Sequence, residues 1–146
     1  MTPASGTRLR ALNGFRAGLA LLAGTLPLLS CSNGVTGPST LAGVWKLQSM
    51  ESAGAERFVP DDPDRFTVAF LDGRIGVTAD CNQCGGSYSV SDETLYVSPL
   101  ACTLILCPTP EGGRFASLID GRSKLESDAR ARLAIQSPEG LLILSR

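Results

Sequence analysis

The chain contains no histidine among its 146 residues. Histidine is the side chain that most often acts as a general base near neutral pH, and it is the commonest ligand of metals in proteins. Catalytic Ser-His-Asp and Cys-His arrangements are therefore excluded. We accordingly expect a protein that is not an enzyme and that has no catalytic residue, no metal site and no cofactor.

The sequence also lacks an excess of basic charge and a long apolar run near its N-terminus. It has 13 basic and 14 acidic residues, and no basic cluster marks a surface for nucleic acid. Residues 17–29 are uncharged and largely apolar, but they are fewer than the roughly 20 residues that a membrane-spanning helix needs. We therefore expect neither a nucleic-acid partner nor a permanent transmembrane helix.

Residues 1–30 have the pattern of a secretory signal that ends at a lipid attachment site. Arg8, Arg10 and Arg16 come before or at the start of the apolar stretch, and Leu28-Leu29-Ser30 stands directly before Cys31. A basic region, a short apolar region and small residues before a cleavage point are typical of an exported chain. The segment resembles a bacterial lipobox, in which the Cys31 thiol takes a diacylglycerol and the leader is removed. The alternative is a buried helix in which Cys31 is incidental.

The remainder of the chain divides into a tether and one domain. Residues 31–40 carry no charge and no large apolar cluster, which predicts a flexible tether after the lipidated cysteine. Residues 41–146 are long enough for one domain with a single core. Without the leader, 10 basic and 14 acidic residues remain, a formal charge of −4 that disfavours docking on anionic lipid. Contact with the membrane is therefore expected through the lipid anchor.

Short runs that alternate apolar and polar residues, separated by turn residues, dominate the domain. The alternation is clear in residues 66–70, and Asp72-Gly73 then predicts a tight hairpin turn. Residues 115–119 have helical spacing, although Gly112 and Gly113 weaken that prediction. We expect a mainly β fold, a small antiparallel barrel-like or meander domain of about seven or eight strands with one short helix.

Two apolar features have both a structural and a functional interpretation. Trp45 lies in an alternating strand and is expected to anchor the core, with a ligand platform as the alternative. The run Leu104-Ile105-Leu106 is expected in the core or the sheet interior. If it were exposed, it would be an interaction patch.

Four further cysteines form two short pairs, Cys81 with Cys84 and Cys102 with Cys107. Such pairs can hold zinc through four thiolates, or they can form two disulfides. An exported chain meets an oxidising compartment in which disulfides persist, and the second spacing is wider than in the commonest zinc sites. We therefore favour two disulfides, and the spacing alone leaves three pairings open.

Several of these residues also match a family pattern, in order and in spacing. The matching features are Cys81-Asn82, Gly86-Ser87-Tyr88, Ala101 with Thr103, Cys107, and the opening run LAGVWKL over residues 41–47. Together they resemble the META domain of HslJ-like bacterial lipoproteins, over nearly all of residues 41–146. The resemblance implies a β domain in the cell envelope and supplies no substrate.

The resemblance also implies a cysteine pairing. Cys84 and Cys102 occupy positions that are often not cysteine in the family, so they are expected to bond to each other and to leave Cys81 with Cys107. Two other residues depart from the family pattern. Asp80 stands where glycine is common, and Leu104 stands where a basic residue is usual, so any surface role of that basic residue is not carried over.

The leader pattern predicts a lipid-anchored envelope protein, and the resemblance to the META domain implies that it lies on the outer membrane and faces the periplasm. Its expected role is in envelope structure or stress tolerance through protein binding. One alternative is a carrier that holds a small apolar ligand inside the β domain, and another is a protease inhibitor that uses a loop stapled by disulfides. Core packing separates the first two, because an interior filled by Trp45, Phe66, Phe70 and Tyr88 leaves no room for a ligand.

Overall fold

The computed structural model describes residues 38–128 and 131–146. Its elements in chain order are α1 (Pro38–Leu41), β1 (Gly43–Ser52), the 3-10 helix η1 (Pro63–Arg65), β2 (Phe66–Leu71), β3 (Arg74–Ala79), β4 (Asn82–Ser91), β5 (Thr94–Val97), β6 (Ala101–Cys102), α2 (Glu111–Ile119), β7 (Gly121–Ser127), β8 (Arg132–Ser137) and β9 (Gly140–Ser145). The predicted leader, Cys31 and most of the predicted tether lie outside the described residues. The last residues of the predicted tether belong to α1.

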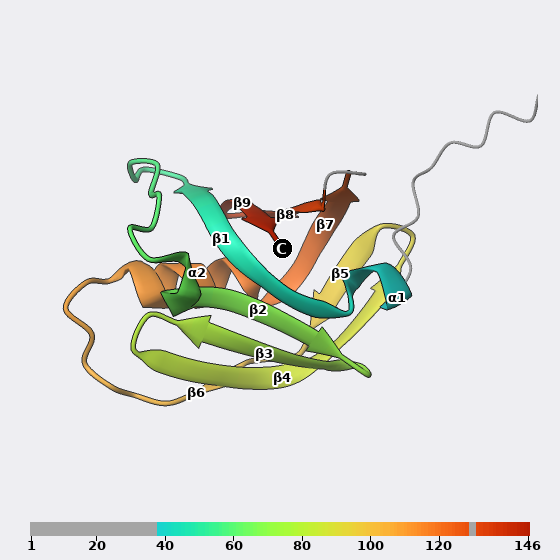
Figure 1. Ribbon diagram of the computed structural model, residues 1–146, viewed down its shortest axis with the longest axis horizontal. Helices are drawn as coiled ribbons and strands as arrows, with labels where there is room; N and C mark the ends of the chain where they lie inside the picture. The colour runs from blue at the N-terminus through green and yellow to red at the C-terminus, as the bar shows by residue number, and fades with distance from the viewer. Residues whose placement is uncertain (1–37, 129–130) are drawn as a thin grey trace, which may run out of the picture. The chain divides into compact units, whose positions relative to one another are not determined.

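Eight antiparallel strands form a closed barrel (Figure 1). The strands follow one another around the barrel in the order β3-β2-β1-β9-β8-β7-β5-β4, and β4 pairs with β3 to close it. The ninth strand, β6, pairs with β4 over two residues and lies outside this ring. The structure therefore confirms the predicted mainly β, antiparallel barrel with about eight strands and one short helix.

Two-residue turns make four of the connections between successive strands, β2–β3, β3–β4, β4–β5 and β8–β9. Asp72 and Gly73 both have positive φ angles, which is the geometry that a tight hairpin between right-twisted strands requires. The same two-residue connection joins β4 to β5 through Asp92 and Glu93. The turns set the register of each pair, so that the apolar side chains of alternate residues point into the barrel.

The barrel interior is filled by side chains from all of its long strands. Twenty-two buried apolar residues form one core cluster. Trp45 is among them, together with Phe66, Phe70 and Tyr88. Phe115, Leu118 and Ile119 of α2 add to this cluster, which shows that the helix packs its apolar face on the strands. In the described part of the chain, the barrel is therefore filled by packed side chains.

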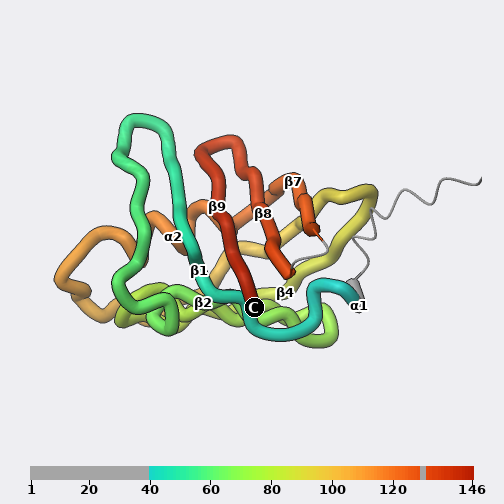
Figure 2. The backbone as a smooth tube through the Cα atoms, turned by 45° about the horizontal axis from the view of Figure 1, so that its top comes forward, coloured from blue at the N-terminus to red at the C-terminus, as the bar shows by residue number. Residues whose placement is uncertain are grey.

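The two ends of the barrel carry different elements, α1 at one end and the connection between β6 and α2 at the other. At one end lies α1, where the described chain begins, and Leu41 of α1 is buried beneath the domain surface. At the opposite end lies the connection between β6 and α2, as the ribbon and the tube view agree (Figures 1 and 2). This connection projects past the strands, and it carries the features described next.

Candidate functional site

Two disulfides fasten the connection between β6 and α2 to the beginning of β4. Cys84 pairs with Cys102 directly across the β4–β6 ladder, with their Cα atoms 4.0 Å apart. Cys81, in the turn between β3 and β4, pairs with Cys107, with Cα atoms 5.7 Å apart. These are the two pairings that the family resemblance implied. All four sulfurs are used in these bonds, so none remains as a thiolate for the zinc site considered above.

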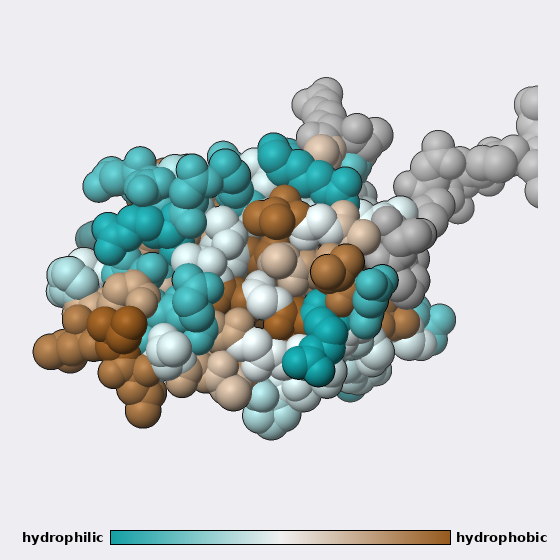
Figure 3. Space-filling view, turned by 60° about the horizontal axis from the view of Figure 1, so that its bottom comes forward, coloured by the Kyte–Doolittle hydropathy of each residue, from teal (hydrophilic) through white to brown (hydrophobic). Residues whose placement is uncertain are grey.

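The residues between the two disulfides form an exposed loop, which we call the apolar loop and define as residues 103–107. Leu104 and Leu106 are 97% and 98% exposed, and Ile105 is 58% exposed. In the space-filling view, apolar side chains gather at this end of the molecule (Figure 3). The expectation that this run lies in the sheet interior is therefore wrong. The run lies outside the sheet because β6 ends at Cys102 and α2 begins only at Glu111. The two disulfides fasten it in this position.

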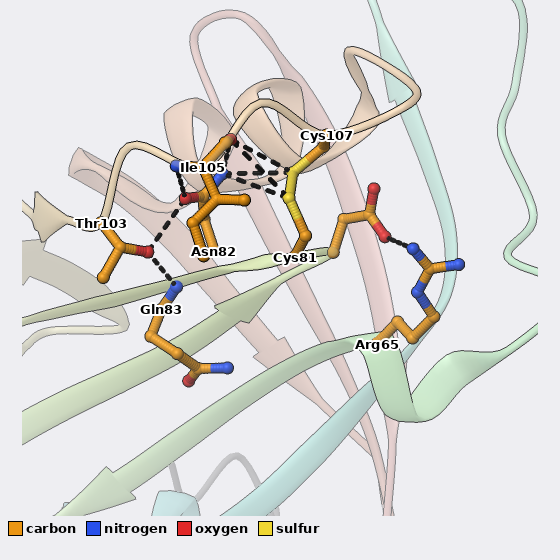
Figure 4. The surroundings of a disulfide bond; sticks show 8 residues. Arg65, Cys81, Asn82, Gln83, Thr103, Ile105 and Cys107 are labelled. Carbon is orange, nitrogen blue, oxygen red and sulfur yellow. Dashed lines mark hydrogen bonds and ion pairs between the residues drawn. A yellow bond between two sulfur atoms is a disulfide. The ribbon is translucent and has the colours of Figure 1, made fainter.

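The side chain of Asn82, at the beginning of β4, forms hydrogen bonds with the backbone of this loop (Figure 4). We call the side of the loop that faces β4 its inner side. Its Oδ1 accepts a hydrogen bond from the Ile105 backbone N–H at 2.8 Å, and its Nδ2 donates to the Ile105 carbonyl at 3.0 Å. The same Nδ2 lies 3.2 Å from the Cys107 sulfur. One planar amide thus satisfies both backbone groups of Ile105, as a neighbouring strand would do.

Thr103 fixes the other side of the loop to β4. Its backbone N–H donates to the Gln83 carbonyl at 2.9 Å, and its hydroxyl accepts from the Gln83 N–H at 3.0 Å. The Thr103 hydroxyl also donates to Asn82 Oδ1 at 2.9 Å. By contrast, the backbone groups of Leu104 and Leu106 make no hydrogen bond within the described part of the chain. The loop is therefore ordered from its inner side and open on its outer side.

The support beneath the loop includes a buried carboxylate. Asp80 precedes Cys81, has a φ of 61°, and has a side chain that is only 3% exposed. It forms an ion pair with Arg65 of η1, and its backbone N–H donates to the Arg65 carbonyl at 2.8 Å. Glycine adopts a positive φ without steric cost, whereas aspartate does so only rarely. Here Asp80 takes this conformation and places its carboxylate on Arg65.

The apolar loop and the segments on either side of it carry no charged side chain. No charged residue occurs between Glu93 and Glu111, so the apolar loop lies in the middle of an uncharged segment. The pKa of Lys124, on β7, is raised by a hydrogen bond from its ammonium group to Glu126 and by the charge of that carboxylate. This pair is outside the loop. The loop therefore presents apolar side chains and backbone groups, and it carries no acidic or basic side chain.

The sequence-predicted site residues fall into three groups. Cys31 lies outside the described residues. The four domain cysteines come together at one end of the barrel, and Trp45 lies in the core, where its indole N–H donates to the Leu41 carbonyl at 2.8 Å. Asn82 was noted only within the match to the family, and its partners Ile105 and Thr103 lie more than 20 residues away. The Cys81-Asn82 match to the family was the signal that could have singled it out.

Solved structures support the fold assignment. A protein from Burkholderia xenovorans, solved by NMR, matches with a TM-score of 0.59 and 20% identity over 75% of this chain and 88% of that one. A lipocalin-like protein from Bacteroides uniformis matches with a TM-score of 0.50 and 16% identity over 73% of this chain and 98% of that one. Comparison with the curated proteins gave no match. At these identities the likeness concerns the fold alone.

Among the described residues, none of the helices has the length and apolar character needed to cross a bilayer. The family comparison matches residues 39–140 to the META domain, which is most of the chain and includes the apolar loop, Asn82 and both disulfides. The chain therefore belongs to the META domain family.

Proposed function

We propose that this protein is a lipid-anchored lipoprotein of the cell envelope whose META domain binds another protein through the apolar loop and catalyses no reaction. The observation that supports the proposal best is the near-complete exposure of Leu104 and Leu106 on a loop fastened by two disulfides. Burial of such aliphatic surface in a complex contributes about 25 cal/mol per Å². Because the loop is already ordered, little conformational entropy is lost on binding.

A carrier of a small apolar ligand is the less supported alternative. Such a protein needs an apolar cavity, whereas the interior of this barrel is occupied by large side chains such as Phe70 and Phe115, both almost completely buried. One of the surface hollows, between the β1 end and α2, is open to solvent and has a mixed lining, in which Ala53 and Leu118 lie beside the charged residues Arg114 and Glu139. The filled core leaves no room for an apolar ligand, and the hollow places charged side chains against one.

The absence of catalysis and the envelope location are parts of the same proposal. The lack of histidine and the uncharged surroundings of the loop give no general base to a nucleophile there. The leader pattern before Cys31 and the two disulfides are both typical of exported proteins. We place the domain on the periplasmic side of the outer membrane, in a role in envelope structure or stress tolerance.

Crosslinking in the native envelope tests the binding function. The full chain and the variant Leu104→Asp/Leu106→Asp are expressed in the host, crosslinked and purified under denaturing conditions. Leu71→Asp is the matched control, because Leu71 is an exposed leucine, 65% accessible, on the β2–β3 hairpin. We expect one reproducible adduct with the wild type and with Leu71→Asp, and its loss with the double variant. An adduct pattern that ignores the loop would contradict the proposal.

Mass spectrometry of the protein from its native envelope tests the anchor. We expect a mature N-terminus at Cys31 that carries a diacylglycerol and fatty acyl groups, palmitate among them. A Cys31→Ser variant should keep its leader and carry no fatty acyl group. A mature wild-type chain without lipid would refute the anchor and leave the binding function of the domain to be judged by the crosslinking result.

A further inference from the structure

We propose that the apolar loop is a substrate-like inhibitory loop for a serine endopeptidase with an apolar primary specificity pocket, with Leu104 as the residue that enters the pocket. This inference rests on the proposed protein-binding function and names the class of partner. It depends on the contacts that hold the residues before and after the Leu104–Ile105 peptide bond to β4 and to the β3–β4 turn.

Within the described structure, the outer side of the loop presents unpaired backbone groups and an exposed leucine side chain, which are the features that a protease cleft binds. Proteases bind their substrates as extended segments, through backbone hydrogen bonds and through one side chain that fills the specificity pocket. The backbone groups of Leu104 make no hydrogen bond in the described part of the chain, and its side chain is 97% exposed. Ile105 turns its backbone groups inward to Asn82, so the adjacent residues are free to pair outward.

The inner side of the loop holds both halves of the Leu104–Ile105 bond. On the acyl side, Thr103 bonds to Gln83 and Asn82, and Cys102 is joined to Cys84. On the amine side, the Ile105 nitrogen donates to Asn82 at 2.8 Å, and Cys107 is joined to Cys81. Figure 4 shows Asn82 between Thr103 and Ile105, with the Cys81–Cys107 disulfide beside them. Both halves are thus attached to the same four-residue stretch, 81–84.

This arrangement has a chemical consequence if a protease attacks the bond. The protease serine oxygen would add to the Leu104 carbonyl carbon, the bond to the Ile105 nitrogen would break, and the serine proton would pass through the protease histidine to that nitrogen. An ordinary amine product diffuses away, and water then hydrolyses the acyl-enzyme. Here the new Ile105 amine is retained beside the ester by Asn82 and by the Cys81–Cys107 bond. It can attack the ester, reform the peptide bond and return the proton to the serine.

Retention of the amine makes religation an intramolecular reaction, which is favoured over attack by water from solution. The complex would therefore persist with the loop intact or reversibly acylated. The position of the loop is consistent with such a partner. It lies at the opposite end of the domain from α1, before which the lipid anchor is expected, so the loop and the point of attachment are separate (Figures 1 and 2).

Inhibition kinetics test the inference directly. The full chain with its disulfides intact is titrated against chymotrypsin and subtilisin, which accept leucine, and against trypsin, which requires a basic residue. We expect stoichiometric inhibition of at least one of the first two and none of trypsin. The exposed-leucine variant Leu71→Asp should inhibit as the wild type does. Absence of inhibition of both chymotrypsin and subtilisin overturns the inference.

Two variants test the assigned bond. Leu104→Arg should move inhibition from chymotrypsin or subtilisin to trypsin, with a change in affinity of about 100-fold or more for each enzyme. Asn82→Ala should still bind but should be cleaved between residues 104 and 105 about 10- to 100-fold faster than the wild type, because the amine is no longer held. Mass spectrometry identifies the cleaved bond. Inhibition that Leu104→Arg leaves unchanged, or wild type cleaved as a simple substrate, overturns the inference.

The outcomes distinguish this inference from the broader function. A non-protease partner that crosslinks in the native envelope only when Leu104 and Leu106 are present would support the protein-binding function and overturn the protease assignment. Loop-dependent flotation with phosphatidylcholine vesicles, without a protein adduct, would overturn both.

Discussion

Trp45 is the residue on which one end of the barrel depends. Its ring is buried in the core, and its indole N–H donates to the Leu41 carbonyl at 2.8 Å. The Arg146 guanidinium lies 4.3 Å from the centre of the ring and donates to the carbonyls of Thr40 and Ala42. One aromatic side chain therefore joins β1, α1 and the C-terminal residue through packing, a hydrogen bond and a cation–π contact.

Replacing Trp45 should separate these contributions. Trp45→Ala should lower the free energy of unfolding by about 3–5 kcal/mol, because it leaves a large cavity in the core. Trp45→Phe should cost less, about 1–2 kcal/mol, because much of the packing remains while the bond to Leu41 is lost. Urea denaturation followed by far-UV circular dichroism measures both, since the tryptophan signal is absent from each variant. Equal losses for the two variants would contradict a core-packing role.

At this scale, sequence reasoning identified kinds of interaction better than it identified partners. The expectation that Trp45 packs in the core follows from alternation, which is a local pattern. The bridging role of Asn82 follows from no local pattern, because its partner Ile105 lies 23 residues further along the chain. Only the closed fold brings these two residues together. The same limit applied to Asp80, whose partner Arg65 belongs to a different element.

At the scale of elements, α2 shows how two adjacent glycines can have opposite roles. Gly112 is buried, and a Cβ atom there would lie 2.5 Å from the Ala79 carbonyl oxygen of β3. Gly113 faces open space, with no atom within 4 Å of such a Cβ. The first glycine allows the start of the helix to lie against β3. The second has no packing reason in the described structure.

The two glycines predict opposite effects of the same substitution. Gly113→Ala should raise the free energy of unfolding by about 0.5–1 kcal/mol, because alanine is the better helix former. Gly112→Ala should lower it by about 1–3 kcal/mol, because the new methyl group meets β3 backbone that must shift. Thermal and urea unfolding of the pair measure the difference. A stabilising Gly112→Ala would show that α2 can move away from β3 without cost.

Elements were predictable where their signals are local. The hairpin turn at Asp72-Gly73 and the short helix near residues 115–119 follow from turn chemistry and from helical spacing. The pairing of β1 with β9 joins the first and the last strand in the sequence. It depends on contacts between residues far apart in the chain, and no local pattern encodes it. The apolar loop was misplaced for a related reason. Three consecutive aliphatic residues usually mark an interior, and only the disulfides and Asn82 reveal that this run is held outside.

At the scale of the whole molecule, the disulfides and the barrel are separate sources of order. The barrel is closed by backbone pairing of β3 with β4 and of β1 with β9. Both disulfides lie at the end of the domain that carries the apolar loop, and they join segments 26 and 18 residues apart. Neither is needed to complete the ring of eight strands. The molecule thus combines a fold that backbone pairing closes with a loop that covalent bonds hold.

Removing one disulfide at a time should expose this division. Cys81→Ser/Cys107→Ser and Cys84→Ser/Cys102→Ser should each lower the free energy of unfolding by about 2–4 kcal/mol, mainly because the unfolded chain gains freedom. Hydrogen exchange measured by mass spectrometry should show faster uptake in residues 81–84 and 101–107, while β1, β8 and β9 keep their protection. The Cys81–Cys107 variant should affect Ile105 more, because that bond and Asn82 hold the same side of the loop. Loss of protection across β1 and β9 would show instead that the loop end is part of the cooperative core.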